Sequence, residues 1–349
     1  MYKTSPNSSS EPSNHLYEKV LRDYFKKLNP IPIYPMNPTS NKLAIIIEPR
    51  YDDITIAVIH NFMYYMSPSS DGDKYSRGWN FMFMSYAGHE HEVRVRFPSM
   101  QFVAIPDKYI EMRDGKPNIS INSYNSILLS KEFWEKTIPA NYENICIFQR
   151  DCIMYKPIPI VFEKYDYAGA TFSDVINNDV FLKPTPFYRQ GINGGFSLRK
   201  RAAMLISINT LTIDAIKEYR NALRDLFKNI YETKYKLSEK KLVDFNFNID
   251  NEDVFFSNAC EIFGFLSPDI LHSTQLALEM PINLATDMPS VYHGWDKSFH
   301  SYTVAVDYLS KSSLFGEFIG MSKTVDKTIL IKEASKTEPA FFLPKNLCD

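Results

Sequence analysis

The sequence predicts an α/β fold with a mostly parallel central sheet flanked by helices. Short β-rich apolar runs alternate along the chain with segments of helical length. A strand, a helix and a second strand in succession imply a right-handed parallel crossover. The strand runs are apolar almost throughout, which is typical of strands that helices cover on both faces. These observations together indicate one layered α/β domain.

The expected elements follow the chain from Lys42. The predicted strands are the runs at 42–50, 79–88, 94–98, 101–105 and 145–149. The predicted helices are 52–66, 126–138, a long amphipathic helix between 212 and 239, and a shorter helix after Asn251. We therefore expect the domain to span 42–300. Residues 1–41 are expected to form a disordered start, a helical arm and a Pro-rich linker, and 301–349 a tail that packs on the domain.

Composition excludes several classes of protein. A formal net charge of −2, from 39 basic and 41 acidic residues, gives no overall attraction to nucleic acid or to an anionic membrane. The four cysteines are scattered without a CxxC pair, which favours reduced thiols over disulfides or a zinc site. No transmembrane segment or signal sequence is evident. We expect a soluble cytoplasmic protein. Enrichment in Asn, Ile, Lys and Tyr suggests an AT-rich genome, microbial or viral, and a viral protein would lie in the host cytoplasm.

Polar residues follow the predicted strands at their carboxyl ends, where open α/β sheets bind ligands. Asp151 comes shortly after the apolar run "ICIF", Glu48 and Arg50 follow the first strand, and Ser85 ends another. A strand-end Asp is more often a turn or a helix cap than a metal ligand. Glu48 and Arg50 could equally pair with each other in a surface loop.

Three later segments could add to such a site. In "GINGGFSLRKR", Asn193 precedes two glycines, Gly194 and Gly195, which would allow close backbone approach to a ligand; a turn before a helix would look the same. In "NEDVFF", Glu252 and Asp253 occupy a predicted first helical turn, where acids are also ordinary dipole stabilisers. In "VYHGW", His293 lies in a polar, non-periodic segment, and a lone His is most often structural.

The ordered series "EPR", "FQRD", "YDYAGATF", "NGGFSLR", "NEDVFF" and "HGW" resembles the glycosyltransferase-like family designated domain of unknown function 5672. The resemblance spans about Leu43 to Trp295. It implies a GT-A type nucleotide-sugar transferase fold. It also implies transfer of a sugar, with UDP favoured as the carrier, to a glycan, glycoconjugate or protein acceptor.

The resemblance also implies roles for the residues by position. The metal site, for Mn²⁺ or Mg²⁺, would include Asp151 and His293, and the catalytic acids would be Asp253, as base, and Glu252. Donor-binding positions would be Glu48, Arg50, Ser85, Gln149, Arg150, Asn193, Gly194 and Gly195. The motif "QRDC" departs from the usual Asp-any-Asp because Gln149 stands where a second carboxylate is common. Since a double displacement needs a separate nucleophile and the sequence nominates none, an inverting mechanism is expected.

Two alternatives remain open at this point. The chain could be a catalytically degenerate sugar- or nucleotide-binding or structural protein on the same fold, which the missing carboxylate would explain. It could also be a metal-dependent nucleotidyltransferase, although the sequence has no GxxxxGK[ST] loop and no Asp pair at a metal spacing.

Overall fold

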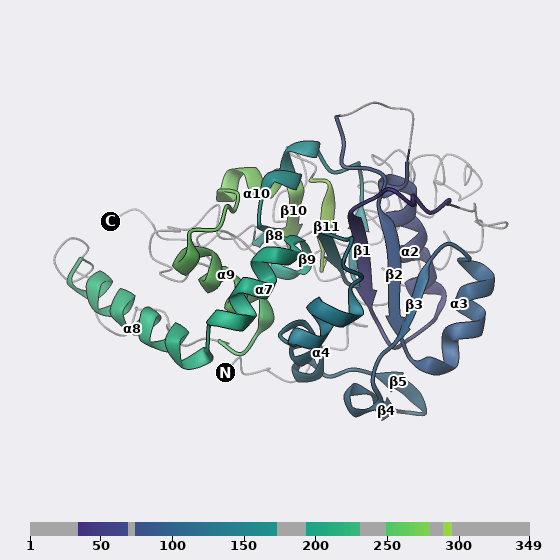
Figure 1. Cartoon of the computed structure of the whole chain (residues 1–349), viewed down its shortest axis with the longest axis horizontal. Helices are drawn as coiled ribbons and strands as arrows, with labels where there is room; N and C mark the ends of the chain where they lie inside the picture. Colours follow the sequence, from purple (N-terminus) through teal and green to yellow (C-terminus); the bar gives the residue numbers. More distant parts are fainter. Residues whose placement is uncertain (1–33, 69–73, 173–192, 231–248, 280–288, 295–349) are drawn as a thin grey trace, which may run out of the picture.

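A computed structural model describes residues 34–68, 74–172, 193–230, 249–279 and 289–294. Its centre is a nine-stranded sheet in the order β3-β2-β1-β6-β9-β8-β10-β11-β7, and most neighbouring strands run parallel (Figure 1). The strands are β1 (Lys42–Ile47), β2 (Asn80–Ser85), β3 (Gln101–Ala104), β6 (Asn144–Phe148), β7 (Cys152–Met154), β8 (Tyr167–Phe172), β9 (Asn193–Lys200), β10 (Ala277–Glu279) and β11 (Val291–His293). The predicted α/β class with a mostly parallel sheet flanked by helices is confirmed.

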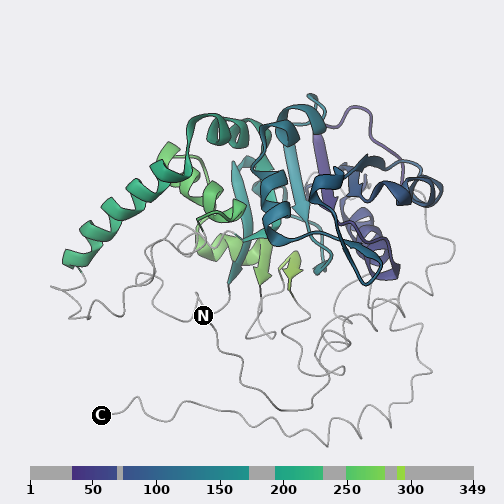
Figure 2. The same cartoon turned by 90° about the horizontal axis from the view of Figure 1, so that it is seen from below.

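Helices cover both faces of this sheet because each central strand buries alternate residues on opposite sides. Ala44 and Ile46 of β1 belong to the core beneath α2 (Asp53–Met66) and α3 (Glu90–Arg96). Leu43 and Ile45 belong to the other core. There the sheet meets α4 (Ile121–Leu128), α7 (Arg201–Thr210) and α9 (Glu252–Phe263). Figure 2, seen from below, shows the strands between these helical layers.

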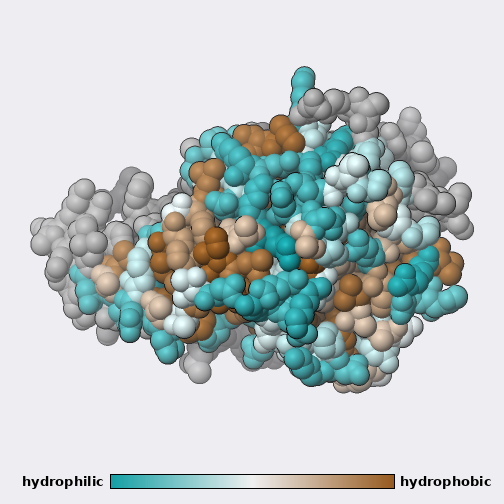
Figure 3. All heavy atoms as spheres, viewed as in Figure 1, coloured by the Kyte–Doolittle hydropathy of each residue, from teal (hydrophilic) through white to brown (hydrophobic). Residues whose placement is uncertain are grey.

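The remaining elements lie at the margins. A two-stranded hairpin joins β4 (Glu111–Arg113) to β5 (Lys116–Asn118), and α10 (Ile270–Leu276) precedes β10. Helix α8 (Ile213–Ile230) projects away from the body in both ribbon views. Short 3-10 turns cover Ala87–His89, Asp107–Tyr109 and Ile160–Lys164. On the face in Figure 3, hydrophilic atoms dominate the centre, and apolar atoms gather over the area of α7 and α9.

Two predicted elements differ from the structure. The run 94–98, predicted as a strand, contains the end of helix α3. Its alternating valines do not share a buried face, because Val93 is buried and Val95 is 70% exposed. An i,i+4 ion pair of 2.7 Å between Arg94 and Glu90 supports the helix instead.

The predicted helix at 126–138 is also two elements. Helix α4 ends at Leu128, and a separate π-helical turn covers Phe133–Thr137. The indole N–H of Trp134 donates to the carbonyl oxygen of Leu128 (2.6 Å), which fixes the turn against the end of α4.

The expectations for 1–33 and 295–349 lie outside the described residues, and so does the part of the predicted long helix beyond Ile230. The three described cysteines, Cys146, Cys152 and Cys260, are buried and form no disulfide. In the described part of the chain, no helix combines the length and the apolar character that crossing a bilayer requires.

Candidate functional site

A cleft of about 260 Å³ opens at the carboxyl ends of β1 and β6. Glu48 follows β1 directly, and the turn 149–151 follows β6, so both chain segments reach the same sheet edge because the two strands are parallel neighbours. The cleft is lined by Ile47, Glu48, Arg50, Ile119, Ser120, Ile121, Tyr124, Gln149, Arg150 and Asp151. The strand-end residues predicted from the sequence therefore share one cavity, except for Ser85.

The two arginines of the cleft are each held by a carboxylate. Arg50 forms a bidentate pair with Glu48, at 2.6 and 2.7 Å. Arg150 reaches Asp52, the N-cap residue of α2, at 2.8 Å. Burial raises the pKa of Asp52, but Arg150 and the Thr55 N–H outweigh burial and lower it below its usual value. The pairing of Glu48 with Arg50 that the sequence allowed is present, and it lies in the cleft wall.

Asp151, the last residue of the turn 149–151, lies beside His293. Nε2 of His293 lies 3.4 Å from Oδ1 of Asp151 and 3.2 Å from Oε1 of Gln149. Together with Cys152, Asp151 and His293 offer ligand atoms within 4.8 Å of one another. On the far side of the ring, Nδ1 of His293 lies 3.8 Å from Oε2 of Glu279.

Sheet pairing brings these distant residues together. His293 ends β11, and β11 lies between β10 and β7. His293 is therefore the register partner of Glu279 in β10 and of Cys152 in β7. The N–H of Gly294 donates to the carbonyl oxygen of Asp151 at 3.1 Å. The segment "VYH", expected to be polar and irregular, is thus a buried strand, and Gly294 ends it in a left-handed conformation at φ 63°.

The electrostatics of His293 follow from its two acidic neighbours. Burial alone lowers the pKa of the imidazole, but Asp151 and Glu279 reverse this and raise the pKa to about 10. Burial and Asp151 together raise the pKa of the Cys152 thiol well above its usual value, and its Sγ donates to the Gly195 carbonyl oxygen at 3.2 Å. Cys152 is therefore a neutral thiol engaged with the backbone.

These residues fit the divalent cation that the family resemblance implies. Ligands bound at about 2.1 Å to one octahedral cation lie about 3 Å apart on adjacent corners. The distances from Nε2 of His293 to Oδ1 of Asp151 and Oε1 of Gln149, 3.4 and 3.2 Å, are close to this ligand-to-ligand distance. A carboxylate oxygen, an amide oxygen and an imidazole nitrogen form a donor set that can hold a divalent cation.

The predicted glycine turn is instead the start of strand β9. Gly194 and Gly195 lie between the candidate cation ligand His293 and the acids of the first turn of α9, Glu252 and Asp253. A Cβ on Gly194 would lie 1.9 Å from Oε1 of Glu252, and one on Gly195 would lie 2.0 Å from Nε2 of His293. The close approach expected of these glycines is therefore an approach to the chain's own side chains.

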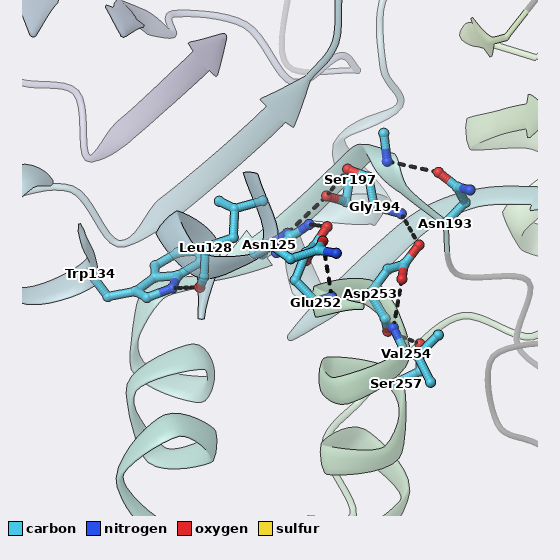
Figure 4. Close-up of polar contacts among 12 residues, drawn as sticks. Asn125, Leu128, Trp134, Asn193, Gly194, Ser197, Glu252, Asp253, Val254 and Ser257 are labelled. Carbon is cyan, nitrogen blue, oxygen red and sulfur yellow. Dashed lines mark hydrogen bonds and ion pairs between the residues drawn. The ribbon is translucent and has the colours of Figure 1, made fainter. Parts of the chain in front are cut away.

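Helix α9 presents its first turn to this strand. The N–H of Gly194 donates to Oδ2 of Asp253 at 3.2 Å, and Oδ1 of Asn193 accepts from the N–H of Gly195 at 2.7 Å (Figure 4). The helix start is fixed from its other side by Asn125, whose Oδ1 accepts from the N–H of Glu252 at 3.3 Å.

Glu252, in the first turn of α9, does not point into solvent. It is buried and forms a bidentate ion pair with the buried Arg199 of β9, at 2.7 and 3.0 Å. The Arg199 guanidinium also lies over the rings of Tyr167 and Phe256, at 5.0 and 5.4 Å. The buried arginine opposite the helix start compensates the charge of Glu252, which allows this acid to be buried.

Asp253 differs from its neighbour. Burial and the adjacent Glu252 raise its pKa to about 7, against the lowering effect of the Gly194 and Val254 N–H groups and of Arg199. The expected preference for the ionised form at a helix start is thus outweighed by burial. With this pKa, the carboxyl group is partly protonated near neutral pH.

One predicted residue, Ser85, lies outside the cleft, and four residues near the site were not predicted. Ser85 is fully buried and donates to the Pro49 carbonyl oxygen at 3.3 Å, behind the cleft wall. Sequence reasoning missed Glu279, Arg199, Tyr124 and Asn125. Of these, only Arg199 left a signal, as a charge within the apolar run of "GFSLRK".

Comparison with solved structures finds similar chains among glycosyltransferases. The chain is 10% identical to mouse xyloside xylosyltransferase 1, covering 72% of this chain and 96% of that one with a TM-score of 0.38. It is 10% identical to the mannosyltransferase Ktr4p of Saccharomyces cerevisiae (58% and 71% covered, TM-score 0.32). It is 12% identical to the glycosyltransferase GlyE of Streptococcus pneumoniae (81% and 64%, 0.33). A comparison with curated proteins gives no match.

The fold and the cleft define an α/β protein with its candidate site at the carboxyl edge of the sheet. A family model described as "Protein of unknown function (DUF5672)" matches residues 99–293, more than half of the chain. The chain belongs to that family, as the sequence motifs predicted. The match includes the turn at Asp151, the glycines of β9 and the start of α9, and it ends at His293.

Proposed function

We propose that this chain is a GT-A type glycosyltransferase that moves a sugar from a nucleoside-diphosphate sugar, with UDP as the favoured carrier, to an acceptor hydroxyl. The observation that carries the proposal is the convergence of three parts at one sheet edge: a cleft with two arginines, the Asp151–His293 pair, and Asp253. The glycines of β9 join the last two parts.

The cleft supports the binding of a diphosphate. Arg50 and Arg150 place guanidinium groups in its wall, where Glu48 and Asp52 hold them in position and balance their charge. Asp151, Gln149 and His293 would hold Mn²⁺ or Mg²⁺, and the bound cation would stabilise the negative charge that develops on the leaving diphosphate. Ile119 and Ile121 give the same cleft an apolar side, against which a nucleoside ring could pack.

Asp253 is the favoured base. With a pKa of about 7 it can accept a proton from an attacking hydroxyl near neutral pH, and the Gly194 N–H holds the carboxylate in one orientation. Glu252 is unsuited to that role, because Arg199 engages both of its oxygens. One base without a second nucleophile corresponds to a direct displacement, so we propose inversion at the anomeric carbon. A glycan, glycoconjugate or protein would supply the acceptor.

The test is a transfer assay with a panel of nucleotide sugars and acceptors in the presence of Mn²⁺, which detects both the released nucleoside diphosphate and the product. We expect at least one donor to be used, and NMR of the product to show inverted configuration. Asp253→Asn keeps the size of the side chain but removes its basicity, so transfer should fall about 10² to 10⁴-fold. Nucleotide and Mn²⁺ binding without transfer for any donor would instead favour a degenerate binding protein.

A further inference from the structure

Glu279 is a buried acid with no assigned role. It ends β10, a strand paired with β8 on one side and β11 on the other, so its backbone is fixed from both sides. Its register partner is His293. Glu279 is 8% exposed, and its Oε2 has no hydrogen-bond partner among the described residues. A buried carboxylate is costly unless a charge or a donor compensates it.

The group that faces this carboxylate is the imidazole of His293. Nδ1 of His293, likewise buried without a hydrogen-bond partner in the described part of the chain, lies 3.8 Å from Oε2 of Glu279. This is within ion-pair distance and about 1 Å longer than an ordinary hydrogen bond. The opposite nitrogen, Nε2, faces Gln149 and Asp151. The ring therefore lies between an acid behind it and the candidate cation ligands in front.

The ring has little freedom to rotate away from this position. Gly195 lies against it so closely that any side chain there would overlap the imidazole. To bind a cation, the ring must also have Nε2, the nitrogen that faces Asp151, free of its proton. In metal sites, a carboxylate that accepts the other ring N–H fixes the tautomer and raises the basicity of the ligating nitrogen.

We propose that Glu279 is the positioning residue of the cation site, accepting the Nδ1–H of His293 so that Nε2 is directed to the cation shared with Asp151. This inference rests on the metal part of the proposed function. It extends the site by one residue that contacts neither the cation nor the substrate.

The test measures binding of Mn²⁺ alone, from the EPR signal of the free ion, to the full chain and its variants. Loss of a second-shell partner of this kind costs about 10 to 100-fold in metal affinity, which is the loss expected for Glu279→Ala. Glu279→Gln keeps a carbonyl acceptor of the same length and should recover part of the affinity. Glu163→Ala is the control, because Glu163 pairs with Lys42 at the start of β1, away from the cleft.

A spectroscopic readout separates positioning from general stability. In the Co²⁺-loaded chain, we expect the exchangeable Nδ1–H proton of His293 to give a shifted NMR signal that is retained in Glu279→Gln and lost in Glu279→Ala. If Glu279→Ala does not fold, a weaker Mn²⁺ affinity in Glu279→Gln with that signal retained supports the inference, and parental affinity in Glu279→Gln overturns it.

The variants also distinguish this inference from the proposed function. If His293→Ala loses Mn²⁺ binding while folded Glu279→Ala binds as the parent does, Glu279 has no positioning role and the cation site stands. If His293→Ala and Asp151→Ala both bind Mn²⁺ like the parent, the cation site itself is wrong, and the inference fails with it.

Discussion

The backbone of Gly195 lies against the imidazole ring of His293, so that a Cβ atom on the glycine would be 2.0 Å from Nε2. The preceding residue, Gly194, has the same relationship with Glu252, at 1.9 Å from Oε1. The start of β9 thus lies between the candidate cation ligands and the first turn of α9, and its two glycines allow His293 and Glu252 to approach the backbone.

The first prediction concerns these glycines. Real Cβ atoms do not approach other atoms this closely, so a methyl group at either position must displace a buried side chain, at a cost of about 1–3 kcal/mol. Gly195→Ala should weaken Mn²⁺ binding, and Gly194→Ala should leave it nearly unchanged while impairing transfer. Thermal unfolding and Mn²⁺ titration of both variants measure these effects.

Gly88→Ala is the matched control for the glycine series, because its Cβ would meet only the Tyr86 ring, at 2.7 Å, in a turn outside the candidate site. Equal Mn²⁺ affinity in the parent and in Gly195→Ala would show that the close contact with His293 does not shape the cation site.

The second prediction concerns the buried pair of Arg199 and Glu252. Removing one partner leaves an uncompensated buried charge, so Arg199→Met and Glu252→Gln should each cost about 3–5 kcal/mol of unfolding free energy. The double variant Arg199→Met/Glu252→Gln should lose less than the sum of the two. Denaturant unfolding of the parent, both single variants and the double variant gives a double-mutant cycle. If the losses of unfolding free energy simply add, the two side chains do not stabilise each other.

The third prediction is the pH dependence of stability at Asp253. Its folded pKa, about 7, is raised from the ordinary 3.8, so the folded state binds the proton more tightly. The resulting stabilisation is fully present below pH 3.8 and is lost as pH rises to about 7. Asp253→Asn should therefore gain stability relative to the parent between these pH values, with no further change above 7. A constant difference across this range would contradict the raised pKa.

The fourth prediction has the opposite sign and lies outside the cleft. Burial lowers the pKa of His60 from 6.5 to about 4, and its Nε2 lies 3.1 Å from the Tyr34 hydroxyl. The stabilisation from a neutral His60 is present above pH 6.5 and is lost as pH falls toward 4. Relative to His60→Gln, the parent should lose stability over that interval. Denaturant unfolding of both proteins at several pH values measures this loss. Parallel curves of unfolding free energy against pH would contradict the prediction.

Sequence reasoning located the strand-end residues because parallel strands bring their carboxyl ends to one edge. Glu48 and Asp151 lie far apart in sequence, yet each follows an apolar run that can be recognised locally. The prediction of a strand at 94–98 was wrong because a short local run does not reveal that the segment ends a largely exposed helix.

Glu279 could not be found in this way. Its position beside His293 depends on the register of two three-residue strands, which no local pattern specifies. The burial of Glu252 depends likewise on Arg199, which reaches it from strand β9. Contacts of this kind are set by the sheet as a whole, so the direction in which a first-turn acid points cannot be read from its helix alone.

The most direct measurement is calorimetric titration of nucleoside diphosphates, UDP first, into the chain with and without Mn²⁺, and into Asp151→Ala. We expect binding that requires Mn²⁺ in the parent and is abolished in Asp151→Ala while the fold is retained. Glu163→Ala should behave as the parent does. If no nucleoside diphosphate binds, or if one binds equally well without Mn²⁺ and to Asp151→Ala, the cleft is not the metal-dependent donor site of a glycosyltransferase.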